Sequence, residues 1–184
     1  MAQQSYLPTS MAPGSPSSSP FGSVTLPQQL METWRSEIRK EAGVDIEATL
    51  RRRIEIYLDH GHGQCYLKNP DVAELVQQAL LFFDGDRYKL SAWVIMPNHV
   101  HALVTPHKGR ELSRILHSLK SYTATEANKL LARRGTFWQP ESFDRYIRDA
   151  KHFASVVRYI ENNPVKARLC ERPGDWPYSS AHFR

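Results

Sequence analysis

Apolar residues recur along the chain in two periods, and the longer stretches have the spacing of helices. Residues three and four positions apart, such as Leu30, Trp34 and Ile38, give each of these stretches one apolar face. The pattern predicts five helices, over residues 30–41, 45–58, 69–83, 113–131 and 149–162. The last helix is expected to stop before Pro164, because a proline has no backbone N–H to donate.

Strand-like sequence is concentrated in the middle of the chain. Apolar runs predict strands over residues 88–96 and 100–105, and a short strand over residues 64–67. Only Pro97 and Asn98 separate the two long strands, which suits an antiparallel hairpin. The expected fold class is therefore α+β rather than a doubly wound parallel sheet.

The first part of the chain differs in composition from the rest. Residues 1–20 are rich in serine and proline and cannot bury enough apolar surface to offset the entropy lost on ordering. Residues 21–26 could form a remnant of a strand. We therefore expect a disordered arm over residues 1–22 and one domain over residues 23–184.

Composition excludes several classes of protein. Two cysteines, Cys65 and Cys170, cannot build a disulfide framework, and no closely spaced pair suggests structural zinc. No apolar stretch is long enough for a transmembrane helix, and the N-terminus lacks the basic and apolar regions of a signal peptide. We expect a cytoplasmic protein without a membrane partner.

The positive charge is unevenly distributed along the 184 residues. Residues 1–31 contain no charged side chain, and residues 32–109 have a net charge of −1. Residues 110–184 carry a net charge of +6, so all the excess positive charge of the protein lies there. This distribution is compatible with a polyanionic partner such as nucleic acid, although many basic proteins bind none.

Two histidines lie two positions apart within the second long strand. Alternate residues of a strand share a face, so His99 and His101 project together while Val100, Ala102 and Val104 point to the core. Two neighbouring imidazoles can bind one divalent cation. The alternative is a pair of surface histidines on an exposed strand face.

Polar side chains line one edge of the last predicted helix. At 100° per residue, Tyr159 lies roughly 110° from the centre of the apolar stripe, and Asn163 and His152 fall on the same flank. Tyr159 could act as a nucleophile there, with Asn163 as an oxygen ligand for a metal. The alternative is a half-buried tyrosine with its hydroxyl in water, and Asn163 as a C-terminal cap before Pro164.

Several motifs occur together in a characteristic order. They read WVIMPNHVH at residues 93–101, FWQP at 137–140, FDRYIR at 143–148, VRYIENNPVKA at 157–167 and WPYSS at 176–180. The first resembles the histidine-hydrophobe-histidine (HUH) motif of single-tyrosine transposases. Taken together, the motifs resemble the REP-associated tyrosine transposases, which are relatives of the smallest insertion-sequence transposases, over about residues 27–183.

The resemblance implies a role for each matching position. His99 and His101 match the metal-binding histidines, Tyr159 matches the nucleophile, and Asn163 matches the polar metal ligand one helical turn later. The metal would be Mg²⁺ or Mn²⁺. The family fold is a small antiparallel sheet flanked by helices, which agrees with the α+β class expected from periodicity.

The resemblance also implies a reaction and a partner. Tyr159 would attack a phosphodiester of single-stranded DNA at a hairpin repeat, leaving a 5′-phosphotyrosine and a free 3′-hydroxyl, and a DNA 3′-hydroxyl would later rejoin the strands. Candidate DNA-binding residues are Lys120, Arg145, Arg148 and His152. Trp138 could stack on a base, but we favour a place in the core.

The chain departs from the family pattern at both ends. The Ser/Pro-rich arm stands where relatives have their first strand, so we expect that strand to be degenerate, and a C-terminal tail that recognises DNA is expected to be absent. The rival function is a decayed or domesticated copy that binds hairpin DNA or RNA without cutting it. For either function we expect a monomer or a homodimer. A histidine-based hydrolase of small phosphoesters is disfavoured, because it would not explain the tyrosine–asparagine turn.

Overall fold

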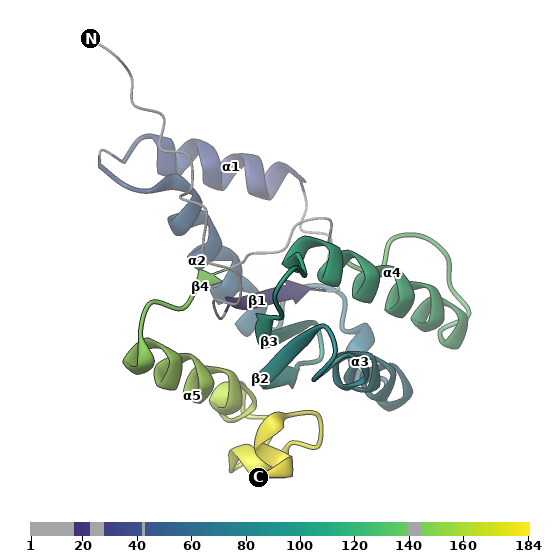
Figure 1. Ribbon diagram of the computed structural model, residues 1–184. Helices are drawn as coiled ribbons and strands as arrows, with labels where there is room; N and C mark the ends of the chain where they lie inside the picture. The colour runs from purple at the N-terminus through teal and green to yellow at the C-terminus, as the bar shows by residue number, and fades with distance from the viewer. Residues whose placement is uncertain (1–16, 23–27, 42, 140–144) are drawn as a thin grey trace.

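The structure is a computed structural model that describes residues 17–22, 28–41, 43–139 and 145–184. Within these residues five α-helices accompany four strands (Figure 1). The helices are α1 (Gln28–Arg39), α2 (Ile46–Asp59), α3 (Pro70–Phe82), α4 (Leu112–Leu130) and α5 (Ala150–Lys166). The strands are β1 (Ser17–Gly22), β2 (Tyr88–Ile95), β3 (His99–Pro106) and β4 (Arg145–Tyr146). The predicted α+β class is confirmed.

The strands form one antiparallel sheet in the order β2-β3-β1-β4. Strand β1 corrects the expected extent of the N-terminal arm, because all six of its residues pair with β3, from Ser17 opposite Val104 to Gly22 opposite His99. Strand pairing uses backbone N–H and C=O groups, so a segment poor in apolar side chains can still join a sheet. Residues 1–16 and 23–27, which include most of the expected arm and remnant, lie outside the described residues.

A β-bulge in β2 decides which side chains face which side of the sheet. The register with β3 shifts between Leu90, opposite Val104, and Ala92, opposite Leu103. The extra residue reverses the alternation of side chains. Tyr88 and Leu90 therefore face one side of the sheet, whereas Ala92 and Val94 face the other. Both faces are therefore apolar, and each needs its own cover of helices.

Different helices cover the two faces (Figure 1). Helices α3 and α4 pack on the face that carries Val100, Ala102 and Val104, and close the main hydrophobic core. Helix α5 packs on the opposite face, against Leu103, through Ile160 and its apolar neighbours. Helices α1 and α2 pair with each other around a separate small cluster. No described helix is long and apolar enough to cross a bilayer.

Two sequence-based boundaries were wrong. Helix α5 does not stop before Pro164 but continues to Lys166, and Pro164 is a buried residue within it. A proline removes one helical hydrogen bond without preventing the turn, and burial of its ring compensates in part. Residues 64–67 do not form a strand; Tyr66–Lys68 is a 3₁₀-helix that leads into α3, where the Asn69 side chain caps the first turn.

Candidate metal and tyrosine site

The histidine pair lies on the face of β3 that α5 covers. His99 is fully buried, His101 is 4% exposed, and their Nε2 atoms are 3.0 Å apart. The residues that alternate with them, Val100, Ala102 and Val104, lie in the main core as predicted. The alternative of two surface histidines is therefore excluded, since both imidazoles are enclosed by protein.

Asn98 determines which nitrogen of His99 is available. Its Nδ2 donates to the carbonyls of Leu58 (2.8 Å) and His62 (2.9 Å), so the amide orientation is fixed. Its Oδ1 must then accept the hydrogen bond from His99 Nδ1 at 2.8 Å. The proton of a neutral His99 is on Nδ1, and the lone pair of Nε2 points toward His101. Asn98 also ties the end of α2 to the start of β3.

A carboxylate completes the cluster, and the sequence analysis missed it. Asp59 is the last residue of α2, and its Oδ1 lies 3.5 Å from His99 Nε2 and 3.6 Å from His101 Nε2. Together the three side chains offer ligand atoms within 4.8 Å of one another, the only such group of three or more His, Cys, Asp or Glu within the described part of the chain.

The donor set fits a divalent cation. Two imidazole nitrogens and one carboxylate oxygen suit Mn²⁺ and several other first-row metals, and Mg²⁺ with its preference for oxygen less well. Adjacent ligands of an octahedral ion with bonds of about 2.1 Å are about 3.0 Å apart, and the two Nε2 atoms have that separation. His99, His101 and Asp59 would hold the ion.

Helix α5 brings the predicted tyrosine and asparagine to this cluster. The Tyr159 hydroxyl donates to Asp59 Oδ2 at 3.0 Å, and its ring meets the His101 ring edge-on at 5.3 Å between centroids. Asn163 is 1% exposed, and its Nδ2 lies 3.4 Å from Asp59 Oδ1. Because the helix continues to Lys166, Asn163 is not a C-terminal cap, and the hydroxyl of Tyr159 has a protein partner rather than only water.

The orientation of Asn163 bears on its predicted role. Its amide nitrogen, not its oxygen, faces Asp59, so in this arrangement Asn163 supports the carboxylate. Its role as a metal ligand stays a prediction.

Burial and the neighbouring groups act in opposite directions on Asp59, whereas burial dominates for His99. Burial alone would raise the pKa of Asp59, but hydrogen bonds and charges from His101 and His99 hold that pKa well below its usual range. Burial lowers the pKa of His99 to about 4, against the partly compensating hydrogen bond with Asp59. Asp59 is therefore ionised and His99 neutral near pH 7, which are the protonation states that bind a cation.

The same carboxylate affects the tyrosine. Burial raises the pKa of Tyr159, and the negative charges of Asp59 and Glu55 raise it further, whereas the hydrogen bond with Asn163 lowers it only in part. The phenol is thus protonated at neutral pH in the arrangement described. A positive charge beside Asp59 would weaken this effect.

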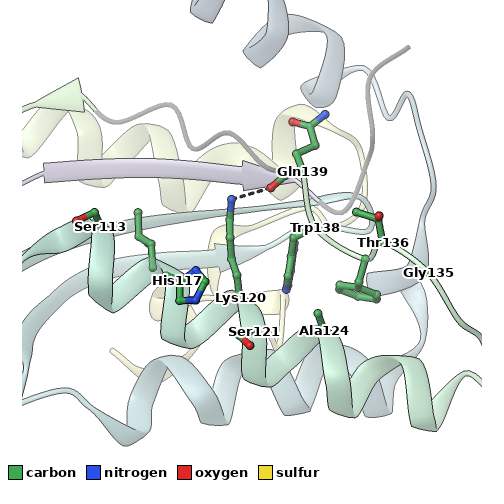
Figure 2. A pocket seen from close by; sticks show the side chains of 11 residues that line it. Ser113, His117, Lys120, Ser121, Ala124, Gly135, Thr136, Trp138 and Gln139 are labelled. Atoms are coloured by element: carbon green, nitrogen blue, oxygen red, sulfur yellow. Dashed lines mark hydrogen bonds between the residues drawn. The ribbon is translucent and has the colours of Figure 1, made fainter. Parts of the chain in front are cut away.

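Of the candidate DNA-binding residues, Lys120 lies away from the cluster, on α4. Its Nζ donates to the carbonyl of Gln139 at 2.8 Å across a hollow of about 610 Å³ between α4 and residues 135–139 (Figure 2). Trp138 lines this hollow but is only 5% exposed and donates to Thr123 Oγ1, so its expected place in the core is confirmed. None of the residues that line the hollow belongs to the histidine cluster.

The other candidates precede or begin α5. Arg148 is exposed, and its backbone N–H donates to His152 Nδ1 at 3.2 Å. His152 also donates from its own backbone N–H to the capping carboxylate of Asp149. The backbone of Arg145 lies in β4, but its side chain is outside the described residues. Their contacts with DNA stay predictions.

The fold and the cluster define a class: a small α+β protein with an antiparallel sheet, in which a pair of buried histidines that could hold a cation faces a tyrosine on a helix. The family described as "Transposase IS200 like" matches residues 64–163, which is just over half of the chain. The chain belongs to this family. The resemblance inferred from the motifs is thereby confirmed at the level of the family.

Individual relatives also resemble the chain. A REP-associated tyrosine transposase of Escherichia coli (strain K12) is 30% identical over 112 residues, which are 59% of this chain and 64% of that protein. The matching segment thus spans less than two thirds of the relative. A solved structure of a REP-associated tyrosine transposase bound to a REP hairpin shares the fold, with a TM-score of 0.59 and 20% identity, and covers 98% of this chain and 84% of that one.

Asp59 lies outside the segment that matches the family, which begins at residue 64. One physical signal in the sequence could have found it. A carboxylate at the C-terminus of a helix is unfavourable, because that end carries partial negative charge, and α2 has no basic residue in its last turn to offset it. A residue in a locally unfavourable place is a candidate for a functional role.

Proposed function

We propose that the protein nicks and rejoins single-stranded DNA through Tyr159, with a divalent cation, Mg²⁺ or Mn²⁺, held by His99, His101 and Asp59. The observation that carries the proposal is the 3.0 Å contact of the Tyr159 hydroxyl with the carboxylate that also meets both histidines. A phenol and a cation site at that separation can act on one phosphodiester. When bound, the cation supplies positive charge that polarises the non-bridging oxygens of the phosphate.

The chain's own residues then account for the bond changes. The Tyr159 oxygen forms a bond to phosphorus, and the bond from phosphorus to the preceding 3′ oxygen breaks. The phenol proton passes to water, and the leaving 3′ oxygen takes up a proton from water, so that no proton is gained or lost overall. Asp59, which accepts the hydrogen bond of the phenol, holds the hydroxyl in place and stays ionised. The products are a 5′-phosphotyrosine and a free 3′-hydroxyl, and attack by a DNA 3′-hydroxyl reverses the step without an external energy source.

The proposed partner is hairpin DNA with an adjoining single strand. This rests on family membership and on the relative solved with a REP hairpin. The surplus of basic residues beyond residue 110 supports it, because phosphate binding supplies most of the affinity of such proteins for DNA.

A second function, binding of the hairpin without cutting, is favoured by one observation. The raised pKa of Tyr159 keeps the phenol protonated and weakly nucleophilic. In that case the histidine cluster would have a structural role and would be inherited from an ancestral enzyme.

Strand-specific labelling separates the two functions. A hairpin oligonucleotide with a single-stranded extension is incubated with the protein and Mn²⁺, then resolved on denaturing gels. With a 3′ label we expect a labelled covalent protein adduct, and with a 5′ label a shorter free fragment. EDTA and Tyr159→Phe should abolish both products.

Tyr122→Phe is the matched control, since Tyr122 is an exposed phenol on α4. A gel shift without any adduct would support binding alone. An adduct that persists in Tyr159→Phe would show that another residue is the nucleophile.

A further inference from the structure

The C-terminal segment covers the outer edge of β2. Ser179 pairs with Val94 in an antiparallel bridge, and the Ile95 N–H donates to the carbonyl of Tyr178 at 2.8 Å. The Trp176 indole N–H in turn donates to the Ile95 carbonyl at 2.9 Å. Because β2 is the end strand of the sheet, these contacts satisfy backbone groups that would otherwise be an open edge.

Glu161 joins this segment to α5. Its Oε1 accepts a hydrogen bond from Ser180 Oγ at 2.8 Å and an ion pair from Arg184 Nη2 at 3.2 Å. The same Ser180 Oγ accepts the Trp93 N–H of β2 at 3.2 Å, and Arg184 donates to the Ser91 carbonyl. Ser180 is 3% exposed and the Glu161 side chain 13%, so the hydrogen bond between them is largely shielded from water, whereas Arg184 is half exposed. The link therefore runs from the helix through the C-terminal segment to the sheet.

Glu161 and Tyr159 lie on opposite flanks of α5. Two residues apart in a helix correspond to a rotation of about 200°. Ile160 lies between them, 1% exposed, and packs on the sheet. Tyr159 therefore points along one side of this contact toward Asp59, and Glu161 along the other side toward Ser180.

Apolar packing alone leaves the rotation of the helix loosely defined, because it is not directional. The hydroxyl is at the far end of the Tyr159 side chain, well outside the Cα radius of about 2.3 Å, so a small rotation of the helix moves it further than it moves the backbone. Misplacement of a reacting group by about 1 Å can slow a reaction about 100-fold. Hydrogen bonds on both flanks restrict this rotation, and on the flank away from the cluster Glu161 provides them.

We infer that Glu161 is a positioning residue, which fixes the rotation of α5 and thereby holds the Tyr159 hydroxyl at the histidine cluster. The inference rests on the proposed function for its effect on reaction rate, but its effect on geometry is independent of that function. Glu161 itself does not touch the histidines or Asp59 in the contacts described.

The test combines kinetics with a structural readout. At saturating hairpin DNA, Glu161→Ala should lower the rate constant for adduct formation about tenfold or more, while the Kd for DNA and for Mn²⁺ change less than about twofold. Glu161→Gln keeps an oxygen acceptor for Ser180 and should restore most of the rate. In the metal-free protein, the nuclear Overhauser effect between the His101 and Tyr159 rings should weaken in Glu161→Ala and persist in Glu161→Gln.

Asn162→Ala, which changes the adjacent residue of α5, is the control for both readouts. Should Glu161→Ala fail to fold, Ser180→Ala removes the hydrogen bond between Ser180 and Glu161 from the other side, leaves the ion pair with Arg184, and should change both readouts in the same direction. An unchanged rate, or an unchanged Overhauser effect, in the variant that lacks the link would overturn the inference. If the wild type forms no adduct, the proposed function fails, and the Overhauser comparison alone decides whether Glu161 sets the rotation.

Discussion

Tyr88 and Tyr159 are two phenols on opposite faces of one sheet, and their partners differ. Tyr88 is fully buried under α3 and donates to the neutral carbonyl of Leu80 at 2.6 Å. Tyr159 is half-buried under α5 and donates to the ionised Asp59 at 3.0 Å. Burial raises the pKa of both, but only Tyr159 has, in Asp59, a partner that a cation would also bind.

The comparison extends to the faces themselves. The face under α3 and α4 is filled by apolar side chains, most of which are buried. The face under α5 is apolar along Ala92, Val94 and Leu103, but at one end polar groups from α2, β3 and α5 meet. Asp59 retains 26% exposure of its side chain there. We call these the core face and the site face, and the difference predicts that stability and cation binding can be changed separately.

The largest expected effect on stability comes from truncating one buried leucine to alanine on each face. Leu80→Ala on α3 and Leu103→Ala on β3 should each lower the free energy of unfolding by about 2–5 kcal/mol, because both side chains are fully buried. Urea denaturation measures this. Calorimetry with Mn²⁺ should show unchanged affinity in Leu80→Ala and weaker binding in Leu103→Ala, which lies two residues after His101 on the site face. Equal effects on Mn²⁺ affinity would mean that the faces are not independent.

Acid should destabilise the metal-free protein through the site face. The pKa of His99 is about 4 in the folded protein and about 6.5 in an unfolded chain, so the unfolded chain binds the additional proton between these values. The free energy of unfolding therefore falls as pH decreases from about 6.5 to about 4, by a few kcal/mol. The lowered pKa of Asp59 adds a further loss below about pH 4.

Urea unfolding in EDTA at several pH values measures this dependence. His99→Gln should flatten it between pH 6.5 and 4, since its side chain does not titrate. A His99→Gln protein with the same pH dependence as the wild type would show that the acid sensitivity arises from other groups.

A smaller effect is expected from the residue that orients His99. Asn98→Ala should weaken Mn²⁺ binding about 10- to 100-fold, because the Nδ1 proton of His99 loses its acceptor and the end of α2 loses its link to β3. Asn98→Asp keeps an acceptor for His99 but loses both amide donor hydrogens. Its affinity for Mn²⁺ should therefore lie between those of the wild type and Asn98→Ala. Wild-type affinity in Asn98→Ala would contradict this role.

The smallest effect is expected from Tyr88→Phe on the core face. Loss of the hydrogen bond to Leu80 should lower the free energy of unfolding by about 1 kcal/mol at pH 7, without an effect on adduct formation. The raised pKa of Tyr88 stabilises the fold below about pH 10, and this contribution is lost as pH rises further. The variant should therefore lose less stability above pH 10 than the wild type, as measured by urea unfolding.

Local periodicity predicted the parts of the molecule that depend on neighbours in sequence. A period of two placed His99 and His101 on one side of β3, and a rotation of 100° per residue placed Tyr159 and Asn163 on one flank of α5. The end of α5 was missed because Pro164 usually breaks a helix, and β1 because its pairing depends on the backbone rather than on apolar side chains.

That the sequence did not predict Asp59 has a different explanation. Asp59 comes next to His99 only because the end of α2 docks on the turn before β3, through Asn98 and the carbonyls of Leu58 and His62. No pattern within α2 specifies where its end docks. The docking of one element on another is determined by tertiary packing, which a single sequence does not display.

The spacing of the site along the chain has a consequence for how the protein folds. The hydrogen bond from Tyr159 to Asp59 joins residues 100 positions apart, and that from Asn163 to Asp59 joins residues 104 positions apart. Contacts of such long range close large loops and form late, after helices and hairpins are in place. Capture of Mn²⁺ by the complete cluster would then report the end of folding, and a fragment limited to residues 64–163 would keep both histidines and the tyrosine but lack the carboxylate that joins them.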